Sequence, residues 1–179
     1  MPDSKLDVTC LPPDQQSDLR RNIIGRIPLH IGRGGIFIFT VTSDQIKSIV
    51  EQELRQHFPE LAWYTVDPKD REANGPLAKI RALLKGMAIR KGHLIQTEKM
   101  DPARTIFTLD IRKLGLRDAG KVLYALNIQR EFVPDNHILF FLWCAPEHTP
   151  RFITDWAKDF WSFRTNFSQF GDIDPTAGQ

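Results

Sequence analysis

The sequence predicts an α/β fold, a three-layer αβα sandwich in which a mostly parallel sheet of four or five strands lies between helices. Two observations carry this prediction. Short apolar, β-branched segments alternate along the chain with longer segments whose apolar residues recur at helical spacing. The apolar segments are also nearly continuous rather than alternating, which is typical of strands buried on both faces of a parallel sheet.

Five segments have the composition of strands. The first reads GIFIFTV and the most apolar reads HILFFLW, and both are rich in the residues that favour strands. In order along the chain, the expected strands are 35–41, 61–66, 104–111, 137–143 and 162–170.

The segments between these strands predict helices with recognisable ends. Ser43 is a good N-cap for a helix that Pro59 ends. Asp118 is expected to cap a later helix, and Thr149-Pro150 to begin the last one with a proline in its first turn. The expected helices are 43–58, 77–84, 118–128 and 150–160.

A chain of 179 residues predicts one domain. We place it at 19–170, after a flexible lead-in at 1–18 that is rich in proline and polar residues, and before a tail at 171–179. The domain is expected to open with a short helix and an extended arm before residue 31, because Gly25 and Pro28 interrupt the helical pattern.

Composition excludes several classes of protein. Hydrophobic residues make up 41% of the chain and charged residues 26%, which is ordinary for a globular protein. The two cysteines, Cys10 and Cys144, are in no metal-ligand spacing, so we expect free thiols and no metal site. The longest apolar run, 138–145, is too short to span a bilayer, and the N-terminus has no signal-peptide pattern. We therefore expect a cytoplasmic protein.

The loop after the first strand is where a nucleotide-binding α/β fold holds phosphate, with glycines that let backbone N–H groups approach the anion. Here that loop reads VTSD at 41–44, without glycine, and Asp44 places a carboxylate where phosphate would bind. Lys47-Ser48 is similar to the Lys-Ser of a P-loop but lies within the helix. The alternative is that the pair belongs to a solvated helix face.

Asp110 ends the apolar strand Ile-Phe-Thr-Leu-Asp, which is the Walker B pattern of a magnesium-holding carboxylate. The next residue, where a hydrolytic ATPase often has glutamate, is Ile111. The alternative is a carboxylate that caps a loop or pairs with Arg112 or Lys113. We therefore treat Lys47, Ser48 and Asp110 as relics of a cofactor site for ATP and magnesium.

No catalytic constellation is present in the sequence. The five histidines are scattered, and no serine lies in a GxSxG elbow. Glu147-His148 follows the fourth expected strand and could reach the same edge as Asp110, but a lone acid–histidine pair is weak evidence for catalysis. We assign no catalytic residue.

Three motifs, LNIQRE at 126–131, ILFFLW at 138–143 followed by Pro146-Glu147, and DFWSFR at 159–164, suggest a family. With the order of elements from about 19 to 170, they resemble the P-loop-NTPase-like domain at the N-terminus of large bacterial signalling and conflict-system proteins, the STAND-type NTPases with tetratricopeptide or similar repeats. The last motif is similar to the Asp-Phe-Trp-Ser-Trp-Arg run that ends these domains. The motifs are packing motifs rather than catalytic ones.

The resemblance implies a P-loop-NTPase-like sheet that serves as a regulatory or recruiting part. With the phosphate loop eroded, we expect a non-catalytic adaptor that mediates protein–protein interaction in a bacterial signalling or defence system. Its expected partner is a repeat-containing NTPase, a protease or another effector.

The aromatic C-terminal segment suggests the interaction surface. Trp156 and Phe160 are four residues apart and are expected in the core. The other aromatic residues of the segment, Trp161, Phe163, Phe167 and Phe170, cannot all face the same way. Aromatic residues and arginine are enriched at interface hot spots, so we expect Trp161, Phe163 and Arg164 to bind a partner and the protein to form a dimer or a heterocomplex. The alternative is that they cover the edge of the sheet.

Two other functions stay open. One is an active NTPase with a cryptic site at Lys47, Ser48 and Asp110. The other is nucleic-acid binding through a basic stretch at 79–99, which holds six Lys or Arg against one acid. The absence of interleaved aromatic residues argues against nucleic acid and for a solvated helix and hairpin. The candidate residues are Lys79, Arg81, Lys85, Arg90 and Lys91, with Lys99 at the end of the stretch.

Overall fold

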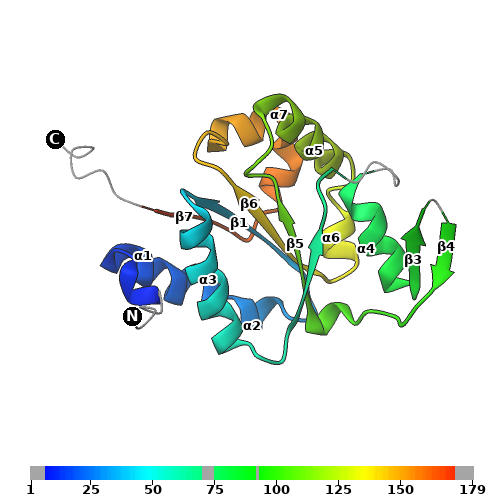
Figure 1. The fold of residues 1–179 in the computed structure, drawn as a ribbon, viewed down its shortest axis with the longest axis horizontal. Coiled ribbons are helices and arrows are strands. Elements are labelled where there is room, and N and C mark those ends of the chain that lie inside the picture. The colour runs from blue at the N-terminus through cyan, green and yellow to red at the C-terminus, as the bar shows by residue number, and fades with distance from the viewer. Residues whose placement is uncertain (1–6, 70–74, 92, 172–179) are drawn as a thin grey trace, which may run out of the picture.

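The computed structural model describes residues 7–69, 75–91 and 93–171 of the chain. Its centre is a parallel sheet of five strands in the order β2-β5-β6-β1-β7 (Figure 1). The strands are β1 (Gly35–Val41), β2 (Ala62–Val66), β5 (Thr105–Asp110), β6 (Leu139–Cys144) and β7 (Asn166–Phe170). The predicted α/β class, with a mostly parallel sheet of four or five strands, is confirmed.

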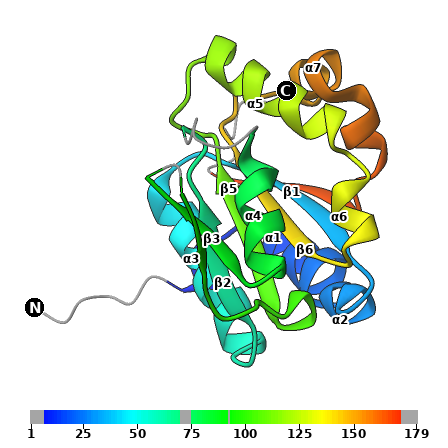
Figure 2. The same cartoon turned by 90° about the vertical axis from the view of Figure 1, so that its right-hand side faces the viewer.

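Helices cover both faces of this sheet, because successive side chains of each buried strand point to opposite sides. In β1, Ile36 and Ile38 enter one core while Phe37 and Phe39 enter the other. The first core lies under α4 (Pro76–Leu84), α5 (Leu116–Ile128), α6 (Phe132–Asp135) and α7 (Pro150–Ser162). The second lies under α3 (Asp44–His57) and the N-terminal helices, on the opposite side of the sheet (Figures 1 and 2).

The strand order decides which loops become neighbours. β6 lies between β1 and β5, with Thr40 of β1 paired to Cys144 and Asp110 of β5 paired to Trp143. Since all three strands are parallel, their carboxyl ends meet at one edge, where ligands of open α/β sheets bind. The loop at 41–44 and Asp110 therefore belong to the same edge.

A separate antiparallel hairpin, β3 (Met87–Arg90) and β4 (His93–Gln96), follows α4 and lies beyond it at the right of Figure 1. Lys91 in its turn has a φ of 48°, the left-handed conformation that tight hairpin turns need. A 3₁₀ turn (Pro102–Arg104) then leads into β5.

The N-terminal region is helical where the structure describes it, although the sequence suggested a flexible lead-in at 1–18 and an extended arm before residue 31. Val8 and Leu11 are buried against the second core, which fixes these turns. The elements are a 3₁₀ turn (Val8–Cys10), α1 (Pro13–Asp18), a π-helical segment (Leu19–Ile24) and α2 (Ile27–His30). Residues 1–6 of the lead-in and 172–179 of the tail lie outside the described residues.

Two local predictions were wrong. α5 begins at Leu116 with Gly115 as its N-cap, so Asp118 lies in the first turn and pairs with Lys121 instead of capping the helix. Trp156 is 38% exposed rather than part of the core, while Phe160 is fully buried. A kink at Ala157, where φ and ψ leave the helical region, separates these two side chains. In the described ranges, no helix is both long and apolar enough to cross a bilayer.

Candidate functional site

The N-terminus of α3 stands at the carboxyl edge of the sheet and is closed by its own side chains. Ser43 caps it as predicted, with its hydroxyl accepting a hydrogen bond from the N–H of Ile46 at 3.1 Å. Asp44 is the first residue of the helix, and its negative charge is favourable beside the positive end of the helix dipole. The carboxylate of Asp44 therefore occupies the position at the helix N-terminus where a phosphate would bind.

Asp44 is held in place from the loop that follows β5. Its Oδ1 lies 2.9 Å from a guanidinium nitrogen of Arg112, and its Oδ2 lies 3.3 Å from Nζ of Lys113. Hydrogen bonds from Arg112 and then Lys113 lower the pKa of the Asp44 carboxyl below its ordinary value. The carboxylate therefore stays ionised at neutral pH.

Asp110 binds Arg112 in a bidentate pair. Nε of Arg112 lies 2.9 Å from Oδ1 and Nη2 lies 2.7 Å from Oδ2, while the backbone N–H of Arg112 also donates to Oδ1. The Arg112 side chain is only 9% exposed. Its burial acts to lower its pKa, but the hydrogen bonds and negative charge of Asp110 and Asp44 outweigh this effect and raise the pKa. The alternative that Asp110 pairs with Arg112 is confirmed.

Lys47 approaches the same carboxylate from α3. Its Nζ lies 2.8 Å from Glu51, 3.7 Å from Oδ2 of Asp110 and 5.1 Å from the ring centroid of Trp143. The Lys47 side chain is 19% exposed and so is half-buried, whereas Ser48 is exposed, as the alternative of a solvated helix face predicts. The Ser48 hydroxyl instead donates to the backbone carbonyl of Asp44. The structure thus unites two of the three predicted relics, Lys47 and Asp110, and leaves Ser48 apart.

This cluster, which we name the edge clasp, consists of three cations matched by three carboxylates: Lys47, Arg112 and Lys113 with Asp44, Glu51 and Asp110. A phosphate would have to displace a carboxylate from its cations, and the two anions would repel. A magnesium ion at Asp110 would stand beside a guanidinium that already engages both carboxylate oxygens. The residues present do not fit ATP and magnesium, and the arrangement works as an internal tie between α3 and the loop after β5.

The other reactive groups near this edge are buried. Burial, and to a lesser degree the charge of Asp110, raises the pKa of the Cys144 thiol, which keeps it protonated and unreactive. His148 is fully buried, and its Nδ1 accepts a hydrogen bond from the N–H of Ala145 at 3.1 Å. Its burial lowers its pKa, so the ring is neutral at pH 7. His148 therefore holds the turn after β6.

Trp161, Phe163 and Arg164 lie where α7 ends and the chain enters the edge strand β7. Trp161 is half-buried, with its ring centroid 5.3 Å from that of Phe167. The Arg164 guanidinium lies 4.0 Å from the Trp161 ring centroid, and Phe163 is 43% exposed. Trp161 packs against the first core, which leaves Phe163 and Arg164 as the accessible part of this aromatic patch.

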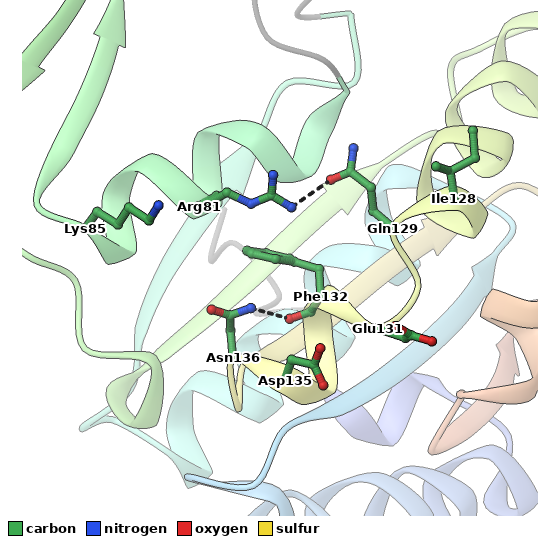
Figure 3. A pocket seen from close by; sticks show the side chains of 8 residues that line it. All are labelled: Arg81, Lys85, Ile128, Gln129, Glu131, Phe132, Asp135 and Asn136. Carbon is green, nitrogen blue, oxygen red and sulfur yellow. Dashed lines mark hydrogen bonds between the residues drawn. The ribbon is translucent and has the colours of Figure 1, made fainter.

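The basic stretch does not form one surface. Arg81 and Lys85, one helical turn apart, line a cavity of about 480 Å³ beside Phe132 and the end of α5 (Figure 3). Arg90 and Lys91 are exposed at the turn of the hairpin, and Lys79 is half-buried on α4 without lining the cavity.

Two residues of the edge clasp and its surroundings, Glu51 and Trp143, were missed from the sequence, and a third, Lys113, was assigned to the wrong carboxylate. Glu51 lies four residues after Lys47, so the i, i+4 rule could have found that pair. No local signal pointed to Trp143, which reaches Lys47 only through the strand order. Lys113 was weighed as a partner of Asp110, but it binds Asp44.

No model of a known protein family matches the chain, and a search among curated proteins gave no significant match. The class that the fold defines is therefore an α/β protein with a five-stranded parallel sheet.

Proposed function

We propose that this chain is a non-catalytic regulatory or adaptor module with a degenerate P-loop-NTPase-like fold. It mediates protein–protein interaction in a bacterial signalling or defence system. The fold family and the bacterial setting rest on the resemblance of the three sequence motifs. The loss of nucleotide function rests on the edge clasp.

The observation that carries the proposal is the bidentate pair between Asp110 and Arg112, which continues to Asp44. In a working site the Walker B carboxylate faces a metal ion and the helix N-terminus faces phosphate. Here a single arginine occupies both carboxylates. A nucleotide would have to break several charge-assisted hydrogen bonds before it formed its own, and these are the stronger class of hydrogen bond.

The aromatic patch supports the adaptor role. Phe163 is a large apolar side chain exposed beside an arginine that lies over a tryptophan ring, and Trp and Arg are enriched at interface hot spots. The patch adjoins β7, an edge strand of the sheet. A partner protein that covers Phe163 and Arg164 would bury apolar area without disturbing the core.

Titration of the protein with ATP and magnesium by calorimetry tests the loss of nucleotide function. We expect no binding heat for the wild type, and none for Asp110→Ala as a matched variant. Magnesium-dependent ATP binding by the wild type that disappears in Asp110→Ala would overturn the proposal in favour of an active NTPase.

Affinity purification from the native host tests the adaptor role. We expect a protein that co-purifies in stoichiometric amount with the wild type and is lost with the double variant Phe163→Ser, Arg164→Ala. Leu29→Ser is the control. Leu29 is 62% exposed on α2, so this substitution also removes an exposed apolar side chain, but away from the aromatic patch. Equal recovery of the partner by all three proteins would exclude this patch as the interface.

A further inference from the structure

A second surface feature lies away from the edge clasp, in the groove between α4 and the corner where α5 passes into α6. The groove encloses about 480 Å³ and is open to solvent. Figure 3 shows Arg81 and Lys85 on the α4 side, and Glu131 and Asp135 on the α6 side. One wall is thus positive and the other negative.

Of the four charged residues of these walls, only Glu131 forms an ion pair among the described residues, with Arg130 at 4.0 Å. Among the described residues, neither Lys85 nor Asp135 forms an ion pair. Arg81 makes no ion pair there either: its guanidinium lies 4.9 Å from the ring centroid of Phe132 and donates to Gln129 at 3.4 Å. Arg81, Lys85 and Asp135 therefore carry charges that no ion pair of the described residues neutralises, and these charges are available to a ligand.

The groove also offers apolar contact. Phe132 is buried, with its ring under Arg81, and Ile128 is 60% exposed at the end of α5. A binding surface with a buried aromatic floor, an arginine stacked on it and a charged rim has the composition of a protein–protein hot spot.

We infer that this groove binds a segment of a partner protein that carries an acidic and a basic side chain close together in its sequence. The acidic side chain pairs with Arg81 and Lys85, and the basic side chain pairs with Asp135 and Glu131. An apolar side chain between them covers Ile128 and the Phe132 ring. This inference rests on the proposed adaptor function and names a second surface for it.

The acidic side chains of the groove argue against binding of a nucleic acid there. Phosphate groups on Arg81 and Lys85 would stand opposite Glu131 and Asp135, and like charges across an interface are unfavourable. A polypeptide can match both signs.

The experiment uses short random peptides displayed on phage and selected against the full chain. Selected peptides are then synthesised, and their affinities are measured by fluorescence polarisation for four variants. Lys85→Glu and Asp135→Lys reverse one charge on each wall. Arg117→Glu and Asp155→Lys make the same changes at exposed positions outside the groove, and thermal melts establish that all four variants fold.

We expect enriched peptides that contain both signs of charge. Each should bind at least about tenfold more weakly to Lys85→Glu and to Asp135→Lys, and normally to the two controls. A peptide with its acidic residue changed to lysine should regain affinity for Lys85→Glu.

The inference is overturned if no peptide is enriched, or if the selected peptides bind all four variants equally. It is also overturned if duplex DNA binds at low salt and Lys85→Glu abolishes that binding. The outcome can be distinguished from that of the calorimetry. A failed selection without ATP binding contradicts only the inference about the groove, whereas ATP binding contradicts the proposed function.

Discussion

The guanidinium of Arg112 lies 2.9 Å from the carboxylate of Asp44 and so ties the loop after β5 to the first turn of α3. The same group is paired to Asp110 at 2.7 Å. Two elements that are distant in sequence are therefore held together by one side chain that is nearly buried.

Replacement of Arg112 by glutamine should lower the free energy of unfolding by about 2 kcal/mol, since it removes charged hydrogen bonds and leaves Asp110 with only the more distant Lys47 as a cationic partner. Arg112→Lys should recover only part of this loss, because an ammonium group cannot make the bidentate pair. Urea denaturation measures both. Arg117→Gln, at an exposed position, is the control and should change stability by less than about 0.5 kcal/mol. Wild-type stability in Arg112→Gln would show that the edge clasp contributes nothing to folding.

Gly120 of α5 lies directly under the indole of Trp156, because a Cβ added at this glycine would come 2.4 Å from Cε2 of the ring. Gly120→Ala should therefore destabilise the protein by about 1–2 kcal/mol, although alanine is the better helix former.

A double-mutant cycle separates the clash from helix propensity. In a Trp156→Ala background the same Gly120→Ala change should stabilise the protein by up to about 1 kcal/mol, because only the propensity difference remains. Thermal denaturation of the four proteins gives the coupling. Additive effects would mean that the ring moves aside without cost.

His148 should make stability depend on pH. Burial lowers its pKa in the folded protein below the ordinary value of 6.5, so the unfolded chain takes up the proton first as pH falls. The contribution of His148 to the free energy of unfolding is complete above about pH 6.5. Below that pH it declines by at most about 1.4 kcal/mol per pH unit. Denaturation at a series of pH values measures the slope.

His148→Asn should reduce that slope, since the amide oxygen can still accept the bond from the Ala145 N–H but does not titrate. His137→Asn is the control, at an exposed position with a φ of 56° that asparagine tolerates. This substitution should leave the slope of stability against pH unchanged. An unchanged slope in His148→Asn would assign the pH dependence to other groups.

The aromatic patch predicts association. At tens of micromolar, light scattering should give the mass of a dimer, or the protein should elute with its partner when it is purified from the native host. Phe163→Ser should shift the dimer to monomer without changing the melting temperature, because Phe163 is 43% exposed. A monomeric wild type with no partner would contradict this prediction.

The sequence was most informative where a single local rule decides the structure. The apolar segments at 35–41 and 137–143 predicted buried parallel strands, and Ser43 predicted the start of α3. Prediction failed where packing overrode local preference. From residue 8 onward the proline-rich N-terminal region is helical because Val8 and Leu11 pack against the second core. The kink at Ala157 moves Trp156 to the surface.

The candidate site likewise has features that the sequence predicts and features that only the tertiary structure determines. The missing glycines and the carboxylates at 44 and 110 are properties of the sequence alone. The glycines and Asp44 already argued against phosphate, whereas Asp110 was interpreted as a relic of a magnesium site. Which cation meets which carboxylate was decided only by the tertiary structure. The physical reason is that an ion pair depends on a separation of a few ångströms. That separation is set by the strand order, which places β6 between β1 and β5 and brings Lys47 to Asp110 and Arg112 to Asp44.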